Sequence, residues 1–130
     1  MDRACYGPLV VDSLEQLAGR GVDPTPHVYA RLFSVEPELE ALFILGPDAK
    51  GHMLEQVLGV ILDHVDAGRY AGSFLRSERV NHEDLGVAPE QFMRFFDVLA
   101  EVLRELSGDQ WSPAHEQAWR ALIADLPARA

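Results

Sequence analysis

The chain has a single cysteine, Cys5, and therefore cannot form an internal disulfide. It also lacks any apolar run close to the roughly 20 residues that a membrane-spanning helix requires. Residues 1–6 show no basic segment followed by an apolar stretch, which is the pattern of a secretion signal. These absences predict a cytoplasmic protein that does not bind a membrane.

Positive charge is also scarce. The 11 Lys and Arg residues are outnumbered by 21 Asp and Glu residues, which gives a net charge of −10. The basic residues are scattered, whereas binding to a phosphate backbone needs them gathered on one face, so we expect no nucleic-acid partner. An acidic surface can steer a basic redox partner, but its commoner effect is solubility, and we interpret the charge in that way.

Sequence motifs of familiar catalytic sites are missing as well. The chain contains no serine nucleophile elbow, no glycine-rich phosphate loop and no paired-cysteine or His-Glu-x-x-His metal motif. The carboxylates of Glu36 and Glu38 belong to a short turn, and we interpret them as solvated surface groups. No catalytic residue is assigned on these grounds.

Helical periodicity, in contrast, runs through almost the whole sequence, and no segment alternates as a strand does. A length of 130 residues is that of one domain, so we expect residues 1–130 to form a single all-α domain. Prolines and glycines interrupt the pattern too often for a coiled coil, and the helices must fold back and pack crosswise. The expected helices cover residues of about 8–18, 23–36, 37–43, 47–65, 70–82, 89–106 and 113–126.

Several helix ends carry recognisable signals. Asp23 is a predicted N-cap before a proline, and Ser112 is another, with Glu116 close enough to assist it. A corner is expected at residues 44–47, and Pro127 is expected to stop the last helix.

His82 is the most informative residue for function. It stands at the end of one expected helix, shortly before Pro89 begins another. An imidazole that binds iron through one ring nitrogen must be aimed from a fixed backbone, and a short corner leaves room beside it for a flat cofactor. Taken alone, however, a histidine at a helix end more often caps the helix or places a favourable charge there, and both interpretations stay open at this point.

Two groups of residues together carry a family resemblance. The first is Tyr29-Ala30-Arg31-Leu32-Phe33, followed by Pro37-Glu38-Leu39 and Leu42-Phe43; the second is His82 with Leu85-Gly86-Val87, Pro89-Glu90 and Phe92. In order and spacing the chain resembles the bacterial single-domain globins and is similar to the globin domain of flavohaemoglobins. The resemblance covers nearly the whole chain. It implies a globin fold, with about six to seven helices packed crosswise around a pocket for haem b.

The resemblance also implies roles for individual residues. His82 would be the proximal iron ligand, and Phe43 would wedge against the haem face. Tyr29 would donate a distal hydrogen bond to bound dioxygen, whose oxygens carry partial negative charge. Val87 and Phe92 flank the corner after His82 and are therefore candidates for the proximal wall, with ordinary core packing as the alternative. Without the resemblance, Tyr29 and Phe43 are more often plain core aromatics.

The distal side departs from the family, because Met53 stands where glutamine or histidine is usual. Met53 could be an apolar, non-bonding neighbour of the iron, or its thioether could bind the iron and give a six-coordinate site. A register shifted by one residue would instead bring His52 to the iron. We prefer a flexible Met53 that fills space, with Val57 one turn later and with His52 and His64 solvated.

Two further departures concern the proximal side. Glu78 lies one turn before His82, where the family places an apolar residue under the haem, so either the helix is rotated or the propionate side is unusual. The chain also ends soon after Leu126, before the late glutamate that makes the proximal histidine of flavohaemoglobins more electron-donating. We therefore expect this increase in electron donation by the proximal histidine to be weak or absent.

These inferences predict a haem globin, monomeric or homodimeric, that reversibly binds dioxygen or another diatomic gas such as NO or CO. One alternative is a nitric oxide dioxygenase or related haem redox enzyme that uses a separate reductase. The other is a haem-free sensor or interaction module that keeps the globin fold as a scaffold.

Overall fold

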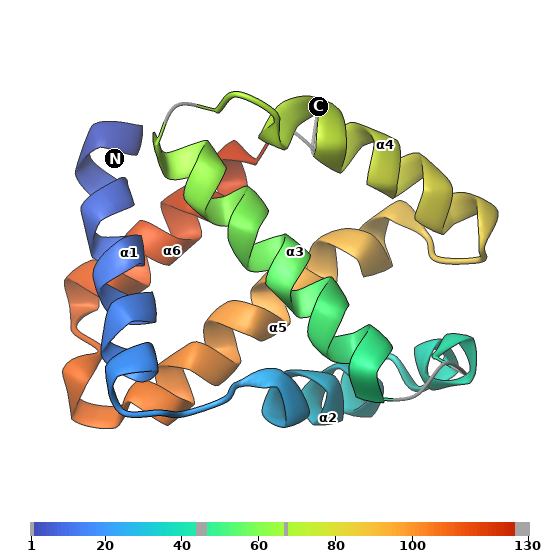
Figure 1. Cartoon of the computed structure of the whole chain (residues 1–130), viewed down its shortest axis with the longest axis horizontal. Coiled ribbons are helices and arrows are strands. Elements are labelled where there is room, and N and C mark those ends of the chain that lie inside the picture. The colour runs from blue at the N-terminus through green and yellow to red at the C-terminus, as the bar shows by residue number, and fades with distance from the viewer. Residues whose placement is uncertain (1, 44–46, 67, 127–130) are drawn as a thin grey trace.

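The computed structural model describes residues 2–43, 47–66 and 68–126, and these residues form helices and no strand (Figure 1). The expected all-α class is thereby confirmed. The elements are α1 (Arg3–Gly19), α2 (Thr25–Val35), the 3-10 helix η1 (Pro37–Leu42), α3 (Pro47–Asp66), α4 (Ala71–Asp84), α5 (Pro89–Ser107), the 3-10 helix η2 (Gly108–Gln110) and α6 (Pro113–Asp125). No helix in the described part of the chain is long and apolar enough to cross a membrane.

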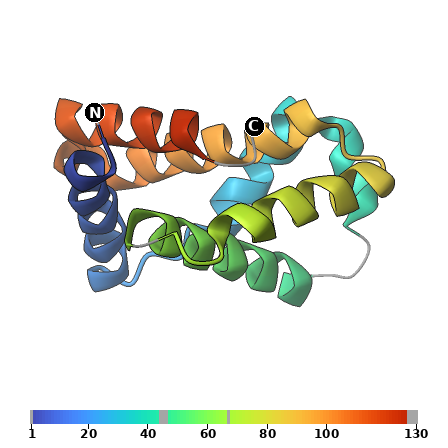
Figure 2. The same cartoon turned by 90° about the horizontal axis from the view of Figure 1, so that it is seen from above.

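The helices pack crosswise in two levels. Helix α5 runs diagonally through the molecule and α3 crosses it (Figure 1). In the view from above, α5 and α6 lie on one side, α3 and α4 lie on the other, and α1 closes one end (Figure 2). Contacts join α1 to α6 and α3, and contacts join α4 to both α3 and α5. Helix α4 therefore contacts both levels.

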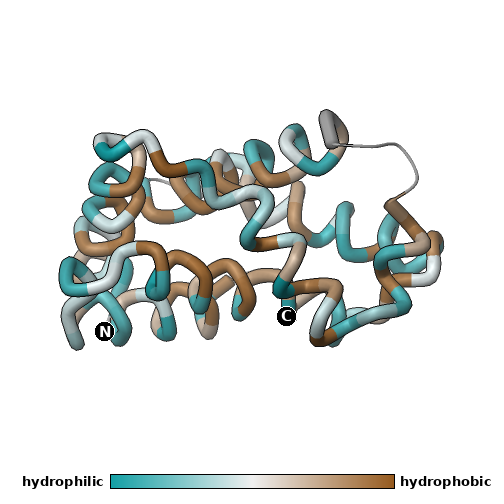
Figure 3. The backbone as a smooth tube through the Cα atoms, turned by 90° about the horizontal axis from the view of Figure 1, so that it is seen from below, coloured by the Kyte–Doolittle hydropathy of each residue, from teal (hydrophilic) through white to brown (hydrophobic). Residues whose placement is uncertain are grey.

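Helix α5 supplies the centre of the core because its apolar residues recur every three or four positions. Hydrophobic positions alternate with hydrophilic ones along the helices, so that each helix presents an apolar side to its neighbours (Figure 3). Helix α6 contributes the buried Trp119 to this core. The indole N–H of Trp119 donates a hydrogen bond to Ser13 Oγ at 2.9 Å, so the buried indole nitrogen is not left without a partner. The buried residues of α5 are Phe95, Phe96, Val98, Leu99, Val102, Leu103 and Ser107.

Helix α1 begins earlier than expected, at Arg3 rather than near Pro8. The side chain of Asp2 caps it by accepting a hydrogen bond from the backbone N–H of Cys5 at 3.0 Å. Pro8 stands inside the helix, where it removes one backbone hydrogen bond. Burial of Tyr6 on the preceding turn offsets that loss, and tertiary packing therefore overrides the local signal.

Other boundaries shift by one or two residues. Pro24 is the N-cap position of α2, and Asp23 instead accepts a hydrogen bond from Thr25 N–H at 3.0 Å. Ser112 caps α6 as expected, accepting from the His115 N–H at 3.2 Å, but His115 rather than Glu116 completes the capping box. Of the corner expected at residues 44–47, residues 44–46 lie outside the described residues, as does the stop expected at Pro127, and Pro47 begins α3.

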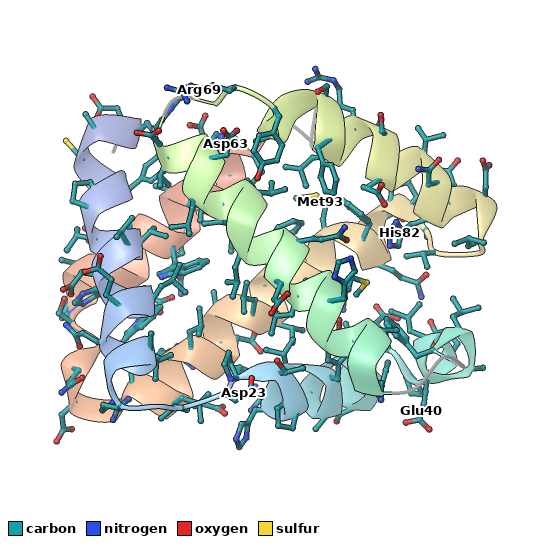
Figure 4. All side chains as sticks on the ribbon, in the orientation of Figure 1. Asp23, Glu40, Asp63, Arg69, His82 and Met93 are labelled. Carbon is teal, nitrogen blue, oxygen red and sulfur yellow. The ribbon has the colours of Figure 1, made fainter. Side chains whose placement is uncertain are left out.

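The carboxylate of Asp63 fixes the start of α4, the helix that carries His82. It accepts hydrogen bonds from the backbone N–H groups of Arg69 at 3.3 Å, Tyr70 at 3.0 Å and Ala71 at 2.9 Å (Figure 4). Burial opposes ionisation of this group, but the three backbone bonds hold the pKa of Asp63 below its usual range. The carboxylate therefore acts as a charged cap at the corner between α3 and α4.

Candidate functional site

An apolar cavity lies among α3, α4, α5 and η1. The space it leaves outside the protein atoms is about 700 Å³, open solvent at its mouth included. Only four of its lining residues are polar, and the remaining walls are aliphatic and aromatic. The polar ones are Gln56, Glu78, His82 and Gln91.

The structure brings six of the residues proposed from the sequence to this one cavity. They come from the C-cap of η1, from α3, from α4, from the loop before α5 and from the first turn of α5, although their positions in the chain span nearly fifty residues. Each is at least partly buried against the hydrophobic core or lines the cavity directly. The six are Phe43, Met53, Val57, His82, Val87 and Phe92.

His82 lies in the last turn of α4, on its inner side (Figure 4). Its Nδ1 is 2.7 Å from the backbone carbonyl oxygen of Glu78. A carbonyl oxygen can only accept, so Nδ1 carries the hydrogen, and in the neutral ring Nε2 keeps the lone pair that a metal needs. The ring of Phe92 packs edge-on against the imidazole with 5.2 Å between centroids. One hydrogen bond and one aromatic contact therefore orient the ring.

Glu78 also lines the cavity, one turn before His82 on the same face of α4. Helix α4 is therefore not rotated so as to turn Glu78 away from the cavity, which was one of the two possibilities that the sequence left open. Its carboxylate oxygen Oε2 lies 3.6 Å from Nδ1 of His82, and the two side chains are 34% and 27% exposed.

Tyr29 stands behind the cavity wall rather than in it. Its ring is buried against Phe33, Phe43 and Phe95, with centroids 5.9, 5.2 and 5.9 Å away. The hydroxyl donates to the backbone carbonyl oxygen of Lys50 at 3.1 Å. Burial raises the pKa of the phenol above its ordinary value, so the group stays protonated and remains a donor.

The histidines of α3 take different positions. His52 is exposed and belongs to a shallow surface hollow with Tyr70, whereas its neighbour Met53 lines the cavity. His64 was expected to be solvated, and that expectation is wrong. It is 4% exposed, and its Nε2 lies 2.9 Å from the hydroxyl of Tyr6, which donates to Asp125 at 2.7 Å.

A polar network around Gln91, which lines the cavity, was not anticipated. Gln91 accepts a hydrogen bond from Ala88 N–H at 3.0 Å and donates to Glu36 at 3.1 Å and to Glu38 at 2.6 Å. The side chain of Glu36 is only 14% exposed and also meets Arg94 at 3.2 Å, so its expected solvation is wrong. The bond from Gln91 lowers the pKa of Glu36, which keeps it ionised.

A sequence signal for Gln91 was present. It stands three residues after Ala88, at the third helical position of a helix that opens with Pro89. That position is the glutamate or glutamine position of a capping box. The two carboxylates that Gln91 reaches lie 55 and 53 residues away, and no local pattern could have paired them.

The residues present fit a flat, largely apolar cofactor that carries a metal. The walls are hydrophobic, and the imidazole of His82 offers a lone pair on Nε2 while its other nitrogen is held by a carbonyl. A backbone or carboxylate partner at the second ring nitrogen is the usual arrangement for a metal-binding histidine.

Comparison with known proteins agrees with this geometry. The family model described as Globin matches residues 26–129. The chain is 27% identical over 116 residues to a flavohemoprotein of Vibrio cholerae, covering 87% of this chain and 29% of that protein. It is 30% identical over 116 residues to a flavohemoprotein of Halalkalibacterium halodurans, covering 85% and 28%. A hemoglobin subunit beta-2 of Xenopus tropicalis is 35% identical over 81 residues, covering 62% and 53%. The chain thus spans less than a third of the flavohemoproteins it matches.

Proposed function

Since the chain belongs to the globin family, whose members bind haem, we propose that it holds haem b in the cavity among α3, α4 and α5. His82 is the proximal ligand, and the protein reversibly binds dioxygen or another diatomic gas such as NO or CO. The bound haem supplies the iron at which the gas coordinates.

The observation that carries this proposal is the contact between His82 Nδ1 and the Glu78 carbonyl oxygen at 2.7 Å. This contact fixes the tautomer of the His82 ring. The backbone of His82 is fixed because the residue lies in the last turn of α4, and the start of that helix is capped by Asp63. A histidine that merely capped a helix end would not also need to face an apolar cavity.

The other residues of the cavity hold and shield the cofactor. Phe43, Val87 and Phe92 give flat or branched apolar contacts and keep water from the metal side of the imidazole. The cofactor is held without covalent bonds, because the one cysteine, Cys5, is exposed on α1 and the sequence has no C-x-x-C-H attachment motif. Non-covalent binding supports haem b.

On the distal side we propose that Met53 fills space and leaves the sixth position to the gas. Met53 and Val57 both line the cavity from α3, whereas His52 belongs to a separate surface hollow. An apolar distal wall supports binding of a small neutral ligand better than binding of an ion. Tyr29 stabilises the ligand only after its hydroxyl leaves the carbonyl of Lys50.

A second candidate is haem redox chemistry such as nitric oxide dioxygenation. It is favoured by the two matches to proteins named flavohemoprotein, each much longer than this chain. For this chain that activity would need electrons from a separate reductase.

The test is titration of the purified protein with haem, followed by absorption spectra of the ferric, ferrous and carbon monoxide forms. We expect one haem per chain in the parent protein and in His52→Ala, and no stable incorporation in His82→Ala. If the His82→Ala protein kept the parent's ferrous spectrum, His82 would not be the ligand. If the parent took up no haem, the chain would be a globin-fold scaffold for sensing or interaction.

A further inference from the structure

Two oxygens of one residue face the same nitrogen of His82. The backbone carbonyl oxygen of Glu78 is 2.7 Å from Nδ1, and the carboxylate oxygen Oε2 of the same residue is 3.6 Å from it. We propose that the Glu78 carboxylate is a positioning residue that acts through His82 to favour the ferric over the ferrous state of the bound iron. This inference rests on the proposed function, because it requires His82 to be the iron ligand.

The geometry separates the tasks of the two oxygens. At 2.7 Å the carbonyl takes the N–H hydrogen bond, whereas 3.6 Å is too long for a second one. The carboxylate therefore acts by its charge, and the direction of the ring does not depend on it. Replacement of the side chain leaves the carbonyl and its hydrogen bond in place.

The surroundings make that charge effective. Both side chains are about one-third exposed or less and line an apolar cavity, so water screens their interaction less than at an open surface. A negative charge beside Nδ1–H draws the proton toward itself and makes Nε2 a stronger electron donor. It also stabilises a metal of higher charge more than one of lower charge, which lowers the reduction potential.

A purely structural role makes a different prediction. Residues four apart on a helix often pair, and such a pair changes helix stability by a small amount. A carboxylate that only supported α4 would change the unfolding midpoint on removal and leave the redox equilibrium of the iron unchanged. The reduction potential and the iron–histidine vibration therefore distinguish the two roles.

The experiment uses the full chain reconstituted with haem, and haem stoichiometry is measured first. Glu78→Gln removes the charge and keeps the size and the backbone carbonyl. Glu78→Ala is the second charge-removing variant, should the first fold poorly. Asp84→Asn is the matched control, because Asp84 is an exposed carboxylate in the same last turn of α4 and does not line the cavity.

We expect Glu78→Gln to shift the ferrous-to-ferric ratio at fixed potential about tenfold toward ferrous, which corresponds to a rise of about 59 mV for a one-electron couple. The iron–histidine stretching frequency of the ferrous protein, measured by resonance Raman, falls in the same variant. Asp84→Asn shifts the ratio much less. Parent-like potential and vibration in a haem-loaded Glu78→Gln protein would overturn this inference alone. Absence of haem uptake by the parent protein would overturn the proposed function and this inference with it.

Discussion

The hydroxyl of Tyr29 lies 3.1 Å from the backbone carbonyl oxygen of Lys50 and donates its hydrogen bond there. Helices α2 and α3 are thereby joined behind the wall of the cavity. The same hydroxyl is the group that the family resemblance assigns to bound dioxygen. Because one O–H can make only one such bond, the two partners compete.

This competition limits the effect of Tyr29 on gas release. In Tyr29→Phe we expect haem to stay bound and dioxygen to dissociate faster, but by less than about tenfold, because the bond gained by the ligand is offset by the one lost at Lys50. Stopped-flow dissociation measures the rate. Tyr70→Phe is the control, since Tyr70 is 46% exposed and does not line the cavity. An unchanged rate in Tyr29→Phe would mean that the hydroxyl never leaves Lys50.

Met53 can be tested by a substitution that keeps its volume. We expect the ferrous parent protein to be high-spin, and Met53→Leu to have the same spectrum, because an apolar side chain that only fills space can be exchanged for another. Met93→Leu is the control, because Met93 lies on α5 and does not line the cavity (Figure 4). A low-spin ferrous parent that becomes high-spin only in Met53→Leu would place the thioether on the iron.

His64 gives the fold a pH dependence. Burial and the nearby Arg3 lower its pKa below the ordinary 6.5, against the opposing charges of Asp125 and Asp63. The unfolded chain therefore binds the proton more tightly, and stability is lost as pH falls through 6.5 toward the lower folded value. In His64→Gln we expect a smaller loss of unfolding free energy between pH 8 and acidic pH than in the parent. Urea unfolding at a series of pH values measures the unfolding free energy of both proteins. An equal dependence of this free energy on pH in the parent and in His64→Gln would contradict the prediction.

Asp63 links the stability of α4 to the retention of haem. Asp63→Ala removes the acceptor of three backbone N–H groups at the start of α4, and loss of such a cap destabilises a helix. We expect a lower urea midpoint and faster transfer of haem to a scavenger protein. Asp63→Asn keeps one side-chain oxygen and should lose less. If haem transfer were unchanged in a destabilised Asp63→Ala protein, the start of α4 would not influence its last turn.

The parts of the structure that sequence patterns predicted best are those set by local periodicity. The apolar stripe of α5 and the helix 47–65 were found because burial repeats every three or four residues. The early start of α1 was missed because proline is a strong local signal for the first turn of a helix, and at Pro8 that signal is overcome by the burial of Tyr6. The all-α class likewise followed from helical periodicity, whereas the globin family followed from the order of several motifs rather than from any one of them.

The polar environment of the site was harder to predict. His64 has its partner Tyr6 58 residues away, and Gln91 has its carboxylates more than 50 residues away, so neither pairing leaves a local pattern. The orientation of the Tyr29 hydroxyl likewise depends on a backbone oxygen of another helix. Side-chain direction at such points is decided by tertiary packing.

The amide of Gln91 has a consequence for how the cofactor enters and leaves. It ties the start of α5 to Glu36 and Glu38, so two chain segments that contribute to the cavity lining are joined. Leu39 and Phe43 line the cavity from one segment, and Val87 lines it from the other. A rigid molecule that passes between them must first break this tether. The tether is therefore a barrier to be crossed in both directions, which slows uptake and escape alike and leaves the equilibrium between them to the residues inside.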